Sequence, residues 1–93
     1  MTGRNAFQAL QSGEVTVAEL RGITEEELSA GLRAGKKLMY AGEHEAAAEV
    51  FAGLALYDPY RSDVWSALEE LFRRERQPEP ANLFSSLARV MAA

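Results

Sequence analysis

The chain has 93 residues, a formal net charge of -4 and 47% hydrophobic residues, which together indicate one soluble globular domain with a small core. The acidic balance argues against a nucleic-acid interface, which requires a basic face, and mildly against binding to an anionic membrane surface. Because the chain has no cysteine, a disulfide framework and a thiolate site are excluded. No apolar run has the length of a signal peptide or a membrane span, so we expect a cytoplasmic protein without stable membrane insertion.

The N-terminal segment, residues 1–23, is only weakly patterned. Its first apolar residues allow one or two helical turns before Gly13. A capping-box pattern from Thr16 to Glu19 predicts a short helix near 16–21. We therefore interpret this segment as a separate N-terminal element.

Apolar residues at helical spacing predict four longer helices, over residues 25–41, 44–57, 62–76 and 80–92. The first begins with a capping box from Thr24 to Glu27 and ends before Gly42. The second ends at Asp58, because the residue before a proline disfavours the helical conformation.

The third helix is predicted to be capped by Ser62 or Asp63, and the fourth carries Pro80 in its first turn, where no backbone donor is needed. No segment shows the alternation typical of a strand. The predicted fold class is therefore all-α.

A run of landmarks crosses these helices at fixed spacing: Gly35, Leu38, Gly42, Ala47, Phe51, Pro59, Trp65, Leu68 and Phe72. Its order of small residue, aromatic, proline and Trp-x2-Leu-x3-Phe resembles the tetratricopeptide repeat. The resemblance implies tetratricopeptide-like antiparallel helical hairpins, about two pairs, preceded by a short N-terminal helix. We expect residues 1–23 to form the N-terminal segment and residues 24–93 to form the helical domain.

The landmark residues are interpreted as scaffold. Gly35 and Ala47 are small where two helix axes approach closely, and Phe51 and Trp65 are expected to be buried. The second repeat starts 34 residues later and is degenerate, with glutamate in place of the small residue and Arg76 in place of the turn glycine. These departures predict a wider hairpin angle or a shifted last helix.

A tetratricopeptide stack binds ligands on the concave face formed by the first helix of each pair. By spacing, the predicted peptide-binding groove consists of Leu32, Lys36, Met39, Tyr40, Glu70 and Arg73. Its apolar members form a strip flanked by charges, which suits an extended apolar peptide. The alternative is that each residue is ordinary surface or contacts the N-terminal helix.

A more specific resemblance is carried by Thr16 to Leu20, Ile23 to Leu28, Ala34, Gly42, Ala47 and the stretch from Val50 to Ser62. These residues are similar to the class II chaperones of bacterial type III secretion, which the chain resembles as a shortened relative. The resemblance implies an all-helical cytoplasmic protein that holds a secreted translocator in its concave groove and dimerises through its N-terminal region. It places Leu32, Lys36 and Met39 in that groove.

The sequence gives little support for a nucleotide-binding, metal-binding or catalytic site. The run from Gly31 to Lys37 resembles a phosphate-binding loop but has the wrong glycine spacing and lies inside a predicted helix. His44 is the only histidine, so the serines lack a base and a metal site lacks ligands. The basic cluster from Arg73 to Arg76 is a solvated helix end or a contact for an acidic client. We expect no catalytic residue, no metal and no cofactor, and hence no enzyme.

The small number of predicted repeats indicates that the protein needs a partner. About three repeats are needed for a stable stack, so we expect a second copy or a partner to complete an apolar surface. The residues favoured for a dimerisation arm are Phe7, Leu10, Val15, Val17 and Leu20. The leading hypothesis is a chaperone-like module that binds a protein client or a secretion component. The alternative is a small homodimeric adaptor that scaffolds a cytoplasmic protein complex.

Overall fold

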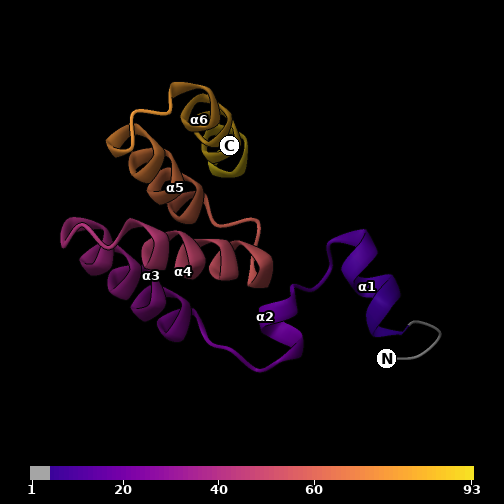
Figure 1. The fold of residues 1–93 in the computed structure, drawn as a ribbon. Coiled ribbons are helices and arrows are strands. Elements are labelled where there is room, and N and C mark those ends of the chain that lie inside the picture. The colour runs from indigo at the N-terminus through magenta and orange to yellow at the C-terminus, as the bar shows by residue number, and fades with distance from the viewer. Residues whose placement is uncertain (1–4) are drawn as a thin grey trace.

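The computed structural model describes residues 5–93, and this part of the chain folds into six helices with no strand (Figure 1). The helices are α1 (Ala6–Ser12), α2 (Val17–Leu20), α3 (Glu25–Tyr40), α4 (His44–Tyr57), α5 (Ser62–Arg74) and α6 (Pro78–Ala92). The all-α prediction is confirmed. Within residues 5–93, none of the helices combines the length and the apolar character needed to cross a bilayer.

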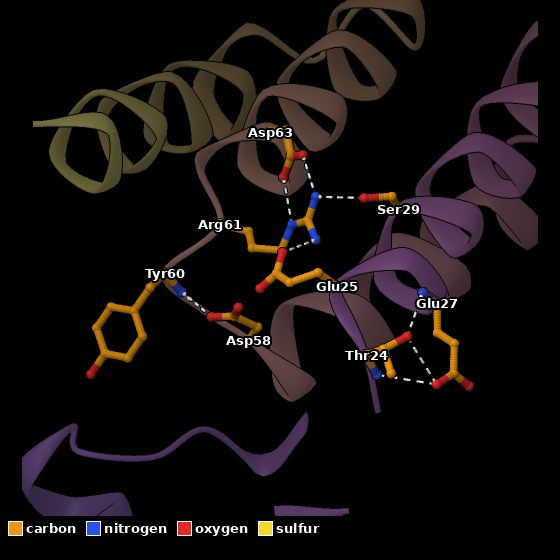
Figure 2. A network of polar contacts seen from close by, with 8 residues as sticks. All are labelled: Thr24, Glu25, Glu27, Ser29, Asp58, Tyr60, Arg61 and Asp63. Atoms are coloured by element: carbon orange, nitrogen blue, oxygen red, sulfur yellow. Dashed lines mark hydrogen bonds and ion pairs between the residues drawn. The ribbon is translucent and has the colours of Figure 1, made fainter. Parts of the chain in front are cut away.

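Local hydrogen bonds fix where the early helices begin. The predicted capping box of α3 is present, since the Glu27 amide donates to Thr24 Oγ1 at 3.1 Å and the Thr24 amide donates to Glu27 Oε1 at 3.1 Å (Figure 2). Thr16 and Glu19 form the same box at the start of α2. Each box satisfies two backbone donors that the first turn leaves without a helical partner.

One predicted helix cap and one predicted helix start are wrong, whereas α5 begins at Ser62 as predicted. The N-cap of α5 is Arg61, which makes no capping hydrogen bond through its side chain, so neither Ser62 nor Asp63 caps this helix. Asp63 instead accepts hydrogen bonds from the Arg61 guanidinium. Helix α6 begins at Pro78, two residues earlier than predicted, because a proline fits the first helical position where no amide donor is needed.

The helices pack in sequence, α3 on α4, α4 on α5 and α5 on α6 (Figure 1). The closest approach that the sequence predicted, between α3 and α4, is present. A Cβ atom on Gly35 would lie 2.5 Å from Cε1 of Phe51, whose side chain is completely buried. The ring of Phe51 therefore occupies the space that the missing side chain of Gly35 leaves.

The ends of α3 and α5 adopt the same turn. Gly42 has φ 83° and Arg76 has φ 60°, and these residues are 34 positions apart. The left-handed conformation favours glycine, so Arg76 adopts it at a cost in strain that Gly42 avoids. The turn thus recurs at the spacing predicted for the repeat, although the residue that forms it differs.

The N-terminal helices relate differently to the rest of the molecule. Ala18 of α2 is buried and belongs to the hydrophobic core, so α2 packs with the helical body on α4. Helix α1 lies to one side of this body (Figure 1). Gly13, which caps α1, approaches the hydroxyl of Tyr60 so closely that a Cβ atom there would lie 2.9 Å from it.

Two glycine substitutions separate packing from helix propensity. Gly53→Ala should stabilise the protein by about 0.5–1 kcal/mol, because Gly53 lies inside α4 and an added Cβ would meet nothing within 4 Å. Gly35→Ala should destabilise the protein despite the same gain in propensity, because its Cβ would collide with the ring of Phe51. Urea unfolding followed by circular dichroism measures both free energies. Equal stabilisation by the two substitutions would contradict the packing described here.

Candidate functional site

Two of the predicted groove residues lie in the core. Leu32 is 7% exposed and Met39 is 1% exposed. Both share one helical row with Leu28 and Gly35, at spacings of three and four residues, and Gly35 contacts α4. The structure therefore corrects the prediction for Leu32 and Met39, whose side chains face the interior instead of lining an open groove.

The other predicted residues lie on a polar face of the molecule. Lys36 and Tyr40 each follow a residue of the buried row, so they lie about 100° around α3 from it. The Arg74 guanidinium stacks over the Tyr40 ring at 4.8 Å from its centroid. This cation–π contact links the end of α3 to α5.

Helix α5 contributes a shallow depression of about 430 Å³ to this face, lined by Ser66, Glu69, Glu70, Arg73 and Arg74. Its charges are paired along the helix, Glu69 with Arg73 at 2.9 Å and Glu70 with Arg74 at 3.1 Å. Arg73 also donates to Asn82 of α6 at 3.2 Å. The predicted residues Glu70 and Arg73 are thus members of neighbouring ion pairs one helical turn long.

Arg61 links α3 to α5 at the other end of the polar face (Figure 2). Its Nη1 donates to Glu25 Oε2 at 3.1 Å and its Nη2 to Ser29 Oγ at 3.2 Å, both on α3. Its Nε and Nη2 also hold both oxygens of Asp63, at 3.1 and 2.8 Å. The Arg61 side chain is only 15% exposed, so this network acts as a cross-link between α3 and α5.

The network shifts the protonation of both partners. The hydrogen bond from Arg61 is the main cause that holds the pKa of the Asp63 carboxyl below its usual value, while partial burial opposes it. The hydrogen bond to Asp63 likewise raises the pKa of the Arg61 guanidinium. Both groups therefore stay charged in the folded protein at neutral pH.

These contacts limit what the polar face can bind. Three arginines of this face, Arg61, Arg73 and Arg74, already form ion pairs with carboxylates of the same chain. A ligand would have to displace these contacts to use them. The polar face is therefore better suited to hold α3 against α5 than to grip an extended apolar peptide.

A second surface is apolar and open. A groove of about 630 Å³, here called the apolar groove, lies where α4, α5 and α6 meet and is lined by Ala48, Ala52, Ala55, Leu56, Pro59, Trp65, Leu68, Phe72 and Phe84. It exists because α6 packs on α5 and makes no extensive contact with α4. Its lining residues carry no charge. Leu56, at its edge, is 76% exposed.

Trp65 and Phe72 form walls of this groove while they also pack against the core, so Trp65 is less buried than expected. Both are only partly buried, because Phe84 of α6 covers one side of them. The Phe84 ring stacks on Trp65 with centroids 6.0 Å apart and contacts Phe72 at 5.3 Å. Trp65 Nε1 also donates to the carbonyl oxygen of Pro59 at 2.7 Å, so the indole is fixed in place.

The apolar groove is a candidate site that sequence reasoning missed. The sequence pattern predicts Trp65 and Phe72 as core residues, but α6 covers only one side of them and leaves the side towards α4 open. One signal was available: α6 has more apolar residues than one contact face needs, since Leu83, Leu87 and Val90 form a row separate from Ala81 and Ala88.

Residues 5–93 contain no group of three or more histidine, cysteine, aspartate or glutamate side chains placed to hold a metal ion. His44 lies at the start of α4 between two exposed glutamates. The apolar groove lacks acids, bases and nucleophiles, so what it can do is bind an apolar surface.

Comparison of the chain with models of protein families, with curated proteins and with solved structures gave no match.

The Asp63–Arg61 pair should make the free energy of unfolding depend on pH in the acidic range. Because the folded protein lowers the pKa of Asp63, the pair contributes stability above the unfolded value of about 3.9 and loses it as pH falls through the lower folded pKa. Asp63→Asn should therefore destabilise the protein at pH 7, by roughly 1 kcal/mol or less because this carboxylate is 45% exposed. Urea unfolding from pH 7 to pH 3 measures this deficit, which should shrink below about pH 4.

The matched control is Glu75→Gln, at an exposed carboxylate beyond the end of α5. Its effect should stay small across the same pH range. A deficit for Asp63→Asn that does not change in acid would contradict the assignment of this pair.

Proposed function

We propose that this protein is a non-enzymatic binding module that holds an apolar helical segment of another protein in the apolar groove. The observation that supports this most is the groove itself, about 630 Å³ in volume and lined by nine uncharged residues, three of them aromatic. Burial of apolar surface is the main favourable term in protein association, and aromatic side chains dominate binding energies at interfaces.

Helix binding is favoured over binding of an extended strand. The groove is bounded by helices, and the described residues include no sheet edge to which a strand could add. An amphipathic helix places apolar side chains at three- and four-residue spacing, which fits the gap that α4 and α6 leave beside α5. The fixed indole of Trp65 provides a rigid wall for such a segment.

We further propose that the helix pairs α3–α4 and α5–α6 are tetratricopeptide-like. Support comes from the contact between Gly35 and Phe51 and from the left-handed turns at Gly42 and Arg76, 34 residues apart. The arrangement departs from a regular stack where α6 leaves α4 uncovered. That departure is what opens the apolar groove.

The class proposed for the protein is a chaperone-like module, in keeping with the resemblance to class II chaperones of type III secretion. A chaperone of this kind shields an apolar stretch of its client, and the apolar groove offers the matching surface. The proposed position differs from the concave face that the resemblance implies, because Leu32 and Met39 are buried there. The proposed location is cytoplasmic, as the resemblance also implies.

Trp65, the only tryptophan, gives a direct test because it lines the groove. Adding an amphipathic peptide of about 15 residues, with leucines on one helical face, should shift its fluorescence to shorter wavelength in a saturable way. Ala52→Glu places a charge in the groove at an exposed position of α4 and should weaken binding at least about tenfold, or 1.4 kcal/mol.

Two controls make the result specific to the groove. Ala34→Glu introduces the same residue at an exposed position of α3 outside the groove lining and should leave binding unchanged. A peptide of the same composition without an apolar face should not bind. Equal affinity of the parent protein and Ala52→Glu for the amphipathic peptide would refute the groove as the binding site.

A further inference from the structure

Helix α6 has an apolar surface wider than its contact with α5. Ala81 and Ala88 are buried and Phe84 stacks on the α5 aromatics. On the outer side, Leu83 is 59% exposed and Val90 is 65% exposed, with Leu87 between them at helical spacing. We call the row of Leu83, Leu87 and Val90 the α6 ridge.

The α6 ridge continues directly from the apolar groove. Successive residues turn about 100° around a helix, so Met91 and Leu87 follow Phe84 on the side away from Ala81, and Leu83 and Val90 come next. No charged residue interrupts this arc. Because Phe84 is also a wall of the groove, groove and ridge form one apolar face with a hollow beside a projection.

We propose that a second copy of this chain covers this face, with the α6 ridge of each copy seated in the apolar groove of the other. The inference rests on the proposed function, since it names the occupant of the same groove. A two-fold symmetric interface uses one surface patch twice, so the patch must complement itself. A hollow and a projection side by side on one molecule meet this requirement.

Charge also favours a second copy. In a two-fold interface a charged residue near the axis comes close to its own symmetry mate, so a patch of like charges there would repel itself. The groove lining contains no charge, and α6 carries only Glu79 and Arg89. Arg89 lies on the opposite side of α6 from Leu87, about 160° around the helix, so it stays outside the paired surface. Glu79 lies one turn before Leu83, so it marks the N-terminal edge of the α6 ridge and does not interrupt the ridge. The net charge of -4 acts only at a distance.

Sedimentation equilibrium over a range of micromolar concentrations tests the dimer directly. The parent protein should pass from a 10.2 kDa monomer to a dimer, and Trp65 emission should shift to shorter wavelength over the same concentrations. Leu83→Glu combined with Val90→Glu changes only exposed residues and should raise the dissociation constant at least about a hundredfold. Ala52→Glu, on the groove side, should also weaken the dimer.

The matched control is Phe7→Glu, which changes an equally exposed apolar residue, 66% exposed, on α1. It should leave the dimer intact. Loss of the dimer in Phe7→Glu, with the dimer retained in Leu83→Glu/Val90→Glu, would overturn the proposal and place the interface on the N-terminal arm.

Cross-linking tests the ridge-in-groove geometry, because the chain has no cysteine of its own. One preparation of the protein carries Leu83→Cys and a second carries Leu56→Cys. When the two preparations are mixed, a short bismaleimide should join the two cysteines. Phe7→Cys mixed with Leu56→Cys should not be joined. A dimer whose Leu83→Cys and Leu56→Cys copies fail to cross-link would contradict this packing.

These outcomes separate the inference from the function on which it rests. A protein that stays monomeric at every concentration but binds the amphipathic peptide through Trp65 refutes the self-association and leaves the groove as a site for another protein. A protein that neither dimerises nor binds the peptide refutes both. Dimerisation with peptide competition for Trp65 supports both, since one groove then serves the two occupants in turn.

Discussion

The position of Phe84 determines which surfaces of this molecule are open. Its ring packs against both Trp65 and Phe72, with centroids 6.0 and 5.3 Å away, and so holds α6 on α5. A helix held in this way covers α5 but leaves the neighbouring side of α4 exposed. The same contact uses only part of the apolar arc of α6, so Leu83 and Val90 remain in solvent. Groove and ridge therefore share one cause.

The polar and apolar surfaces have complementary roles. Arg61 and Arg74 tie α3 to α5 at opposite ends, one by hydrogen bonds to Ser29, Glu25 and Asp63 and the other by stacking on Tyr40. Such contacts are directional, so they fix the relative position of the two helices. The lining of the apolar groove contains no ion pair of this kind, and apolar contacts are less directional than hydrogen bonds. The polar links thus hold in place α3 and α5, and α5 forms one wall of the apolar groove.

Local features of the fold could be predicted well from the sequence, and long-range placement could not. The capping boxes at Thr16 and Thr24 depend on residues three apart, and the contact of Gly35 with Phe51 lies within one hairpin. The predicted groove failed at Leu32 and Met39 because a repeat pattern does not say which row of α3 faces inward. Trp65 was misplaced for a different reason: its burial depends on how α6, beyond the loop at Arg76, returns onto α5.

The exposed apolar face matters energetically because the domain is small. Burying a leucine or valine side chain completely is worth about 1.5–3 kcal/mol, and Leu56, Leu83 and Val90 are each more than half exposed. A domain of this size is stable by only about 5–10 kcal/mol. The transfer free energy gained by covering these three side chains is therefore comparable in size with the free energy of unfolding of the whole domain. It follows that the stability of this protein should rise with the concentration of whatever fills the groove, because binding to the folded state alone shifts the folding equilibrium.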